Sequence, residues 1–445
     1  MARIRSGSAE LGGTRFDVTV VGGGLAGVAT ALAAAGHGAR TLLLDESASL
    51  GGNATGAFVH TFCGLYENEG TDTPRIANPG FAEHFAASLV ATGGAGEPER
   101  AGRVWVLATD PPAIAALAAA LCESSPTLTT RLACRLVAAR LATGGSSRSA
   151  LALSDANGAE RVEIETELVV DASGDGVLGS LGGALAERAG ADALQLPSYI
   201  ARIAGVLPED VAGFGRLRLS VAVAGAARRR DLPEGCESVL LRPAARTGEA
   251  YLTLNLSRAE LAAAADPDPL RARRALEGRA RGHVEAILAH LRETRPGYAN
   301  CRAVAWPDRL GVREGTRLLG RDLLVAPDLL EGRRHDDEVA VSTWPIELWH
   351  DHRGASFRHP KGPSSIPLGA LVSRSHPRLG MAGRCLSASH EALGALRVLG
   401  TALATGEAIG LAAALAAERG CALAQVKASE VRQARSSAIT TSRAL

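Results

Sequence analysis

A glycine-rich segment near the start of the chain has the residue types and spacing that bind the pyrophosphate of a dinucleotide. Gly22, Gly24 and Gly27 stand in the GxGxxG pattern. The first glycine permits a tight turn, the second lets the backbone approach a phosphate, and the third lets the following helix pack closely on a strand. Leu25 leads into that helix and Ala26 opens it, and the free N–H groups at its start attract an anion.

The elements that must position this segment are predicted on both sides of it. A strand, an alanine-rich helix and a second strand are expected at residues 16–21, 26–35 and 40–44. A carboxylate follows at Asp45, 18 residues after Gly27, where the ribose hydroxyls of a bound dinucleotide lie. The next residue, Glu46, is an alternative ribose ligand. The sequence therefore predicts a dinucleotide-binding β-α-β unit.

Four further segments narrow the class of dinucleotide. They read LGGNAT at residues 50–55, DASGDG at 171–176, GVREGTR at 311–317 and GRCLSASHEALGALRV at 383–398. With the glycine motif, they resemble the FAD-dependent oxidoreductase family of the glutathione-reductase-like flavoprotein superfamily. The resemblance spans roughly residues 17–420, nearly the whole chain.

The resemblance implies FAD as the cofactor, expected to bind without a covalent link, and it assigns ligands by position. Those implied for the adenosine and pyrophosphate part are Gly22, Gly24, Leu25, Ala26, Gly27, Asp45, Glu46, Leu136, Ser173 and Gly174. Those implied for the ribityl chain and the flavin ring are Gly51, Gly52, Asn53, Ala54, Gly383, Arg384, Leu396, Arg397 and Val398. The last three enter a helix whose N–H groups would stabilise the negative charge of reduced flavin. Many relatives have Asp where Arg384 stands, and Glu is commoner than Asp at position 45.

The predicted fold is α/β, with a Rossmann-like FAD-binding domain assembled from both ends of the chain and carrying a β-meander. Its two parts are expected at residues 15–185 and 346–422. An inserted, mainly antiparallel α+β substrate domain is expected at 186–345, and a frayed polar tail at 423–445. Further helices are predicted at residues 112–123, 258–264, 269–292 and 393–417. Further strands are predicted at 128–133, 136–141, 150–154 and 161–164 in the meander, with turns at 144–147 and 157–158, and at 168–170, 217–223, 238–241 and 250–256.

Five side chains are candidates for the chemistry. His60 follows the glycine loop and could act as a general base while a hydride leaves the substrate; the alternative is a structural histidine. His390 could be an acid–base group or could order its loop, and Arg397 could offset charge on the reduced flavin. Arg313 suits a substrate carboxylate or the flavin, or a bracing ion pair with the next residue. His350 is expected to line the substrate pocket.

Two other chemistries are weighed at these positions. Covalent attachment of the flavin through His60 or Cys63 stays open, as does catalysis by the Cys63 thiol, although buried cysteines are usually inert. No metal site is expected, because His350 and His352 alone supply too few ligands.

The composition of the chain argues against several other classes of protein. The 445 residues carry a net charge of +1, with 46% hydrophobic residues, 51 glycines and seven cysteines without a CxxC pair. Such a chain folds, has no global attraction to nucleic acid or membrane, and lacks a disulfide or iron–sulfur framework. Only two of the basic residues are lysines, which with the alanine excess indicates a GC-rich, bacterial source. Apolar runs such as residues 113–122 fall short of the ~18 residues that span a bilayer, and a cytoplasmic protein is expected.

No second GxGxxG unit is evident between residues 175 and 345, so a built-in NAD(P) domain is not expected. The sequence therefore predicts hydride transfer between a small organic substrate and N5 of FAD, with an external electron acceptor or donor and with a homodimer left open. One alternative is a flavin-dependent monooxygenase or halogenase, although TWPIELW at residues 343–349 lacks the halogenase WxWxIP pattern. An alternative of another class is an RNA-binding or tRNA-modifying flavoprotein, which the overall neutrality disfavours.

Overall fold

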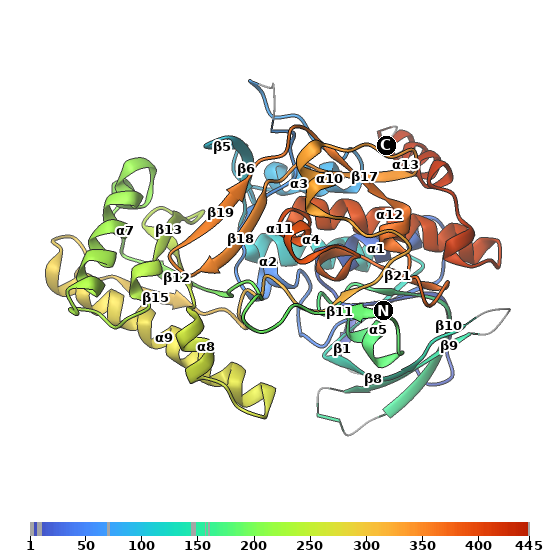
Figure 1. Cartoon of the computed structure of the whole chain (residues 1–445), viewed down its shortest axis with the longest axis horizontal. Coiled ribbons are helices and arrows are strands. Elements are labelled where there is room, and N and C mark those ends of the chain that lie inside the picture. The colour runs from blue at the N-terminus through green and yellow to red at the C-terminus, as the bar shows by residue number, and fades with distance from the viewer. Residues whose placement is uncertain are drawn as a thin grey trace.

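The computed structural model describes residues 4–6, 11–68, 72–143, 148–155, 157–158 and 161–443, and the turn predicted at residues 144–147 lies outside them. Figure 1 shows an elongated molecule with a sheet-and-helix body at each end. The larger body contains both ends of the chain, and the smaller one is built from the middle of the sequence.

The larger body is organised around parallel strands. Their order is β1 (Ile4–Ser6), β7 (Leu128–Leu132), β3 (Thr41–Leu44), β2 (Arg15–Val21) and β10 (Arg161–Asp171). β10 also pairs in parallel with β21 (Leu379–Met381), which brings a late segment of the chain into the sheet. The predicted β-α-β unit is confirmed, because α1 (Leu25–Gly36) connects β2 to the parallel strand β3.

The meander is present but differs from the prediction in two ways. It consists of β8 (Cys134–Arg140), β9 (Ser149–Asp155) and the first half of β10, paired antiparallel. The prediction of two separate strands at 161–164 and 168–170 is wrong, because β10 runs unbroken and its residues 165 and 166 pair with β2 as well. The prediction of 128–133 as a meander strand is also wrong, since β7 pairs in parallel with β3.

Two helices over this sheet pack so closely that the backbone of one lies against the backbone of the other. α12 (Leu399–Glu418) packs along α1, and a Cβ at Gly406 would lie 2.2 Å from the Ala26 carbonyl oxygen. At Gly410 a Cβ would lie 2.3 Å from the Thr30 carbonyl oxygen. Only glycine allows this approach, so part of the glycine and alanine excess serves to bring α12 onto α1.

The single helix predicted at residues 393–417 is wrong in one respect, because it is two helices. α11 (His390–Leu396) is capped by the Ser389 hydroxyl, and the chain becomes extended at Val398 before α12 begins. The first turn of α12 is fixed where the Gly400 N–H donates to the Cys63 carbonyl at 3.0 Å. The break gives α12 an N-terminus of its own.

Among the described residues, one helix is long and apolar enough to cross a membrane, judged by length and composition alone. That helix is α12, with a mean hydropathy of 1.5, but 94% of its apolar window is buried inside the protein. Its apolar character is explained by its place in the core between α1 and the neighbouring strands.

The smaller body is an antiparallel sheet covered by helices. Its strand order is β13 (Leu240–Pro243), β14 (Glu249–Asn255), β12 (Ser198–Ala204) and β15 (Arg302–Ala305). The helices are α6 (Pro208–Val211), α7 (Gly213–Arg228), α8 (Arg258–Ala263) and α9 (Pro269–Thr294). The predicted helices at 258–264 and 269–292 are confirmed.

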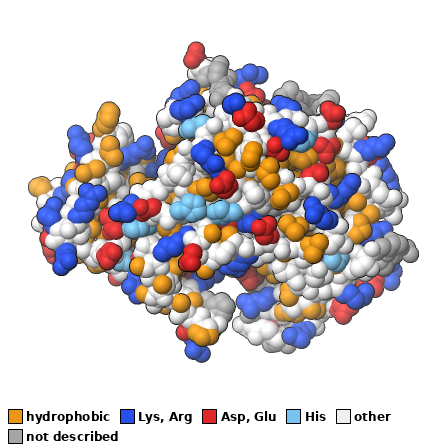
Figure 2. Space-filling view, viewed as in Figure 1, with side chains coloured by type: hydrophobic (Ala, Val, Ile, Leu, Met, Phe, Trp, Pro, Cys, Tyr) orange, Lys and Arg blue, Asp and Glu red, His pale blue; other side chains and the backbone are white. Residues whose placement is uncertain are grey.

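The strand predicted at residues 217–223 is wrong, because this segment lies in α7. Its alternating Leu and Val residues fit a strand, but burial follows the helical period: Leu219 and Val223 face the core, while Leu217 and Val221 are 58% and 61% exposed. Figure 2 shows hydrophobic side chains on the outer part of this helix.

The C-terminal segment is not a frayed tail. It forms α13 (Ala428–Arg443), whose Val431 is fully buried, and Arg435 makes an ion pair of 2.9 Å with Glu407 of α12. The helix therefore belongs to the larger body.

The remaining elements complete the two bodies. Those in the first half of the chain are α2 (Asn53–Gly56), β4 (Thr61–Phe62), α3 (Phe81–Ala91), β5 (Glu99–Ala101), β6 (Val104–Ala108), α4 (Pro111–Ser124), α5 (Val177–Leu181) and β11 (Ala186–Glu187). Those in the second half are β16 (Arg317–Leu318), α10 (Ala326–Glu331), β17 (Glu338–Ser342), β18 (Ile346–Asp351), β19 (Gly354–Arg358) and β20 (Ser364–Pro367). Leu329 of α10 and Val339 of β17 pack in the same core as α1 and α12.

Candidate active site

A cavity of about 950 Å³ is lined by residues of both bodies. One end is formed by the loop between β2 and α1, the end of β3 and the start of β8. The other end is formed by β12, β13, β14, α8 and α9, with residues 309–314 and 397–402 between the two ends. This volume lies in the range of ligand sites, about 300–1,000 Å³.

The glycine motif builds the first end as the sequence predicts. Gly22 has φ 111°, a conformation that favours glycine, and a Cβ there would lie 2.4 Å from the Ala172 carbonyl oxygen. A Cβ at Gly27 would lie 1.8 Å from the Gly22 carbonyl oxygen. At Gly24 a Cβ would meet only the Gly52 Cα at 3.9 Å, so it would stand in the cavity. Gly24, Leu25 and Ala26 line the cavity at the N-terminus of α1.

The predicted ribose ligands lie at the same end. Asp45 lines the cavity while its carboxylate accepts the Gly23 N–H at 2.5 Å and the Ser47 N–H at 2.6 Å. Glu46 is exposed and lies 3.7 Å from the Arg135 guanidinium. Leu136 of β8 lines the cavity beside them.

The loops after β3 and β10 close this end. Gly51, Gly52 and Asn53 line the cavity, and the Asn53 amide donates to the Val312 carbonyl at 3.0 Å. Ala54 is fully buried in the core instead. Ser173 and Gly174 line the cavity, as do Gly383 and Arg384.

The charge of Arg384 is compensated by three partners in the cavity wall. Its guanidinium donates to the Gly174 carbonyl at 2.9 Å and to the Val312 carbonyl at 2.6 Å, and pairs with Asp175 at 3.1 Å. Arg384 therefore ties together the β10 loop and residue 312 across the cavity.

His60 lies in the cavity wall with one ring nitrogen unpartnered. It is 5% exposed and stacks on Tyr251 of β14 at 4.2 Å. Its Nδ1 lies 2.8 Å from the Phe58 carbonyl oxygen, which can only accept, so Nδ1 carries the proton. No described residue bonds to Nε2. Burial lowers the pKa of His60 to about 4; the hydrogen bond to Phe58 opposes this shift and the charge of Arg242 adds to it. The imidazole is neutral at pH 7.

Arg313 and Arg397 share the middle of the cavity with one carboxylate, Glu347. Glu347 accepts the indole N–H groups of Trp344 at 2.9 Å and Trp349 at 2.5 Å. Burial alone would raise the pKa of Glu347, but Arg397, the two indoles and Arg313 together lower it. Burial, with Arg397 next in effect, lowers the pKa of Arg313 to about 9. The sequence-predicted pair of arginines is thus brought together.

The structure places the two other candidate histidines outside the cavity lining. His390 is half-buried, and its Nδ1 lies 2.8 Å from the Glu314 carboxylate, which also pairs with Arg317 at 2.5 Å. His350 is exposed on β18, with its ring 5.4 Å from that of His390. Figure 2 shows histidine side chains gathered on the surface over β18. Glu314 itself lines the cavity, so His390 contacts it from behind.

Leu396 also lies outside the cavity lining, buried in the core, whereas Arg397, Val398 and Leu399 line it. The Cys63 thiol lines the cavity too, but burial raises its pKa to about 12, so it is not a thiolate. In the part of the chain that is described, no cluster of metal-ligating side chains occurs.

Sequence reasoning did not identify Arg242 and Asn255, or the role of Glu347. Arg242 and Asn255 come from β13 and β14, in a segment with no motif. The role of Glu347 could have been inferred from the tryptophans on either side of it, because a buried indole N–H usually needs a hydrogen-bond acceptor such as a carboxylate.

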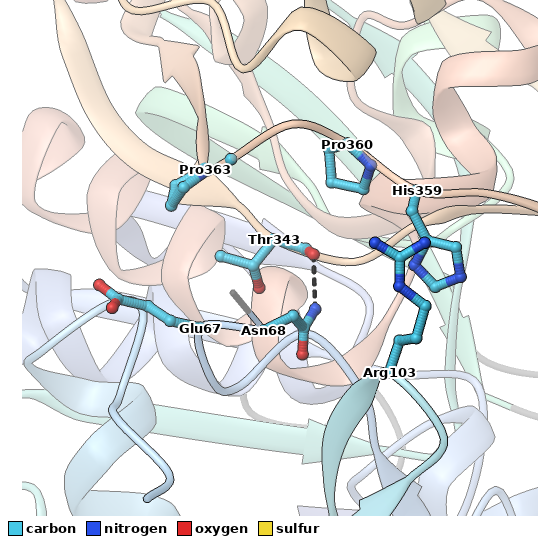
Figure 3. Close-up of a pocket in the computed structure, with 8 residues that line it drawn as sticks. Glu67, Asn68, Arg103, Thr343, His359, Pro360 and Pro363 are labelled. Carbon is cyan, nitrogen blue, oxygen red and sulfur yellow. Dashed lines mark hydrogen bonds between the residues drawn. The ribbon is translucent and has the colours of Figure 1, made fainter. Parts of the chain in front are cut away.

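A second pocket, of about 70 Å³, lies near the surface (Figure 3). It is lined by Asn68, Arg103 and Thr343, among others, and the Asn68 amide donates to the Thr343 carbonyl at 2.7 Å. Asn68 also accepts the Trp105 N–H at 3.1 Å. These hydrogen bonds of Asn68 hold the surrounding loops together, and the pocket is too small for a dinucleotide.

The family described as FAD dependent oxidoreductase matches residues 17–434. The chain belongs to this family. It is therefore a flavoenzyme of the oxidoreductase type, and its cofactor is FAD. A search of curated proteins returns no match.

Solved structures that resemble this flavoenzyme are distant in sequence. The p-nitrophenol 4-monooxygenase PnpA from Pseudomonas putida is 11% identical, with a TM-score of 0.46, covering 94% of this chain and 88% of that one. PqsL from Pseudomonas aeruginosa, described as a probable FAD-dependent monooxygenase, is 15% identical, with a TM-score of 0.44 and coverages of 97% and 93%. A geranylgeranyl bacteriochlorophyll reductase-like protein from Thermoplasma acidophilum is 14% identical, with a TM-score of 0.43 and coverages of 97% and 83%.

The residues around the cavity fit FAD. The N-termini of α1 and α12, neither of them bonded to a capping side chain of the described chain, both line it. Such a terminus binds an anion through its free N–H groups. The cavity is also open at Gly24, where any side chain would intrude.

Proposed function

We propose that this flavoenzyme is a dehydrogenase or oxidase that removes a hydride and a proton from a small organic substrate. When bound, FAD supplies the hydride acceptor. The observation that carries the proposal is the neutral, buried imidazole of His60, whose Nε2 lone pair has no partner among the described residues.

The end of the cavity formed by the loop between β2 and α1 would hold FAD. The N-terminus of α1 would bind the pyrophosphate and Asp45 the adenosine ribose, with Ser173 and Gly174 above the adenosine. The loop of Gly51 to Asn53, and Gly383, would hold the ribityl chain. The N-terminus of α12 would face the flavin ring and stabilise negative charge there.

Holding and deprotonating the substrate is proposed for the opposite end. His60 would take the substrate proton on Nε2, with Nδ1 fixed by the Phe58 carbonyl and the ring held flat against Tyr251. The sheet of β12 to β14, within the proposed substrate domain at 186–345, would close over the substrate. Electrons would then leave to an external acceptor.

The test replaces the base and keeps its structural hydrogen bond. In His60→Asn the side-chain amide can still donate to the Phe58 carbonyl, but it offers no base. Removing a general base typically costs about 10² to 10⁴ in rate, so anaerobic bleaching of the flavin by its substrate should slow by that factor. His37→Asn, at the exposed end of α1, is the matched control and should bleach at the wild-type rate.

Substrates are found by anaerobic bleaching screens across hydroxy acids, amino acids, amines and alcohols. The proposal predicts bleaching without NAD(P)H or oxygen. An oxygenated or halogenated product that forms only with oxygen and a reductant would overturn it, and so would a wild-type bleaching rate in His60→Asn.

A further inference from the structure

The cavity has more positive than negative side chains, although the chain as a whole is almost neutral. Eight arginines and five carboxylates line it. Three of these arginines, Arg242, Arg313 and Arg397, line the cavity with the single carboxylate Glu347. Arg397 and Arg313 both act on that carboxylate, whereas the charge of Arg242 acts on His60. Burying cations in this way is costly unless an anion joins them.

Two of these three arginines are held in place by the protein. Arg313 donates to the Leu196 carbonyl at 2.5 Å and to the Asn255 side chain at 2.7 Å, and it lies 4.3 Å over the Trp349 ring. Arg397 donates to the Glu347 carbonyl at 3.2 Å and lies 3.8 Å from its carboxylate. Glu347 can neutralise one of these two charges.

Arg242 is different, because nothing in the described chain holds it. It is half-buried on β13 and lines the cavity, yet it forms no hydrogen bond and no ion pair with a described residue. Arg242 lies directly across the β13–β14 pair from Tyr251, on which His60 stacks, and its charge acts on His60 and Cys63. A guanidinium in a cavity with five unbonded N–H donors is suited to a bidentate carboxylate.

FAD does not account for Arg242. The N–H groups at the start of α1 would hold the pyrophosphate, and those at the start of α12 that are not bonded to the Cys63 carbonyl would face the flavin ring. Arg242 comes instead from the antiparallel sheet, on the side where His60 stacks on Tyr251. An anion that pairs with Arg242 would therefore belong to the substrate and not to FAD.

We propose that the substrate is a small organic acid whose carboxylate is bound by Arg242, with the carbon to be oxidised beside Nε2 of His60. This inference rests on the proposed function and adds the substrate class to it. Arg313 and Arg397 supply a fixed positive field around the carboxylate, and Asn255 and Thr253 line the same wall. Neutral amines, alcohols and sugars leave Arg242 unpaired and are poor substrates.

The experiment measures binding to the FAD-loaded enzyme without turnover. Benzoate and acetate are titrated against their neutral counterparts benzamide and acetamide, and binding is followed through the flavin absorbance. The acids should bind at least tenfold more tightly than the amides. Arg242→Gln should weaken acid binding about 10- to 100-fold, which is about 1.4 to 2.8 kcal/mol, and Arg242→Lys should recover part of it. Arg246→Gln, an exposed arginine beyond β13, is the control and should bind as wild type.

Three results would overturn the inference. They are equal binding of acids and amides, wild-type acid binding in Arg242→Gln, and tighter binding of inorganic phosphate than of either acid. The proposed function fails separately, because His60→Asn should keep acid binding while losing flavin bleaching. Retained bleaching in that variant overturns the base and leaves the carboxylate site standing.

Discussion

Replacing Gly406 by alanine tests whether the contact between α12 and α1 positions the FAD site. The new Cβ would lie 2.2 Å from the Ala26 carbonyl oxygen, whereas ordinary contact begins at 3.4 Å, so the helices must part by about 1.2 Å. No rotamer relieves a contact between a Cβ and a backbone oxygen. Overpacking of this kind costs about 3 kcal/mol, against a gain of about 1 kcal/mol in helix propensity. A net loss of about 2 kcal/mol in the free energy of unfolding is expected.

The size of the effect in a melting experiment follows from the chain length. At about 2.1 cal/mol/K per residue, the unfolding entropy of this chain is about 0.9 kcal/mol/K. Gly406→Ala should therefore lower Tm by about 2 °C. Ala26 also lies at the N-terminus of α1, so the shift displaces the proposed pyrophosphate site, and the Kd for FAD should rise about tenfold, or about 1.4 kcal/mol.

The matched control is Gly282→Ala in α9. It is the same substitution in an exposed helix interior, with no atom within 4 Å of the new Cβ, and it should raise Tm by about 1 °C. Tm is measured by differential scanning calorimetry and the FAD Kd by fluorescence titration. If Gly406→Ala behaves like Gly282→Ala in both measurements, the argument from close contact is refuted.

Three further predictions concern titration and charge. The folded-state pKa of His60, about 4, lies below its unfolded value of about 6.5, so the stability due to neutral His60 is complete above pH 6.5 and is lost as the pH falls towards 4. Between pH 7 and 5, urea unfolding should show about 2 kcal/mol more loss in wild type than in His60→Asn; equal losses would contradict the buried, neutral imidazole. Arg435→Met leaves the buried Glu407 carboxylate, whose pKa is raised chiefly by burial, without its cation. The free energy of unfolding should fall by about 3 kcal/mol at pH 8 and by less at pH 5. A loss of stability that is larger at pH 5 would contradict this prediction. An acid bound at Arg242 removes a charge that lowers the pKa of His60, so the apparent pKa of the base should be higher in the kcat profile than in that of kcat/KM, and identical profiles would argue against the neighbouring carboxylate site.

The sequence predicts the dinucleotide end of the cavity because its determinants are local. Gly22, Gly24 and Gly27 occupy one turn and the start of one helix, and their spacing alone fixes which backbone groups approach. The same local logic fails for α7, where Leu217, Leu219, Val221 and Val223 satisfy a period of two while burial selects only every fourth residue. Tertiary packing decides between the two periods, and a single sequence does not contain it.

The substrate end could be predicted only in part, for a different reason. His60, before β4, and Arg397, between α11 and α12, were expected from their motifs, whereas Arg242 of β13 and the role of Glu347 of β18 were not. No motif links segments so far apart. His390 and His350 illustrate the opposite error, because their sequence neighbours belong to the site while their side chains lie behind the wall or at the surface.

The net charge of the whole chain differs here from the charge balance inside the cavity. A value of +1 for the chain disfavours binding to a polyanion, because a long-range field needs a net excess of one sign. It says nothing about a cavity in the protein, where the local dielectric constant is lower than in bulk water and each uncompensated charge acts at short range. Arg242 shows the consequence: burial is the main reason that the pKa of His60 is low, and the charge that would attract a carboxylate lowers it further. Once a carboxylate neutralises Arg242, the same imidazole becomes a stronger base, so the binding of an acid would itself prepare the group that deprotonates it.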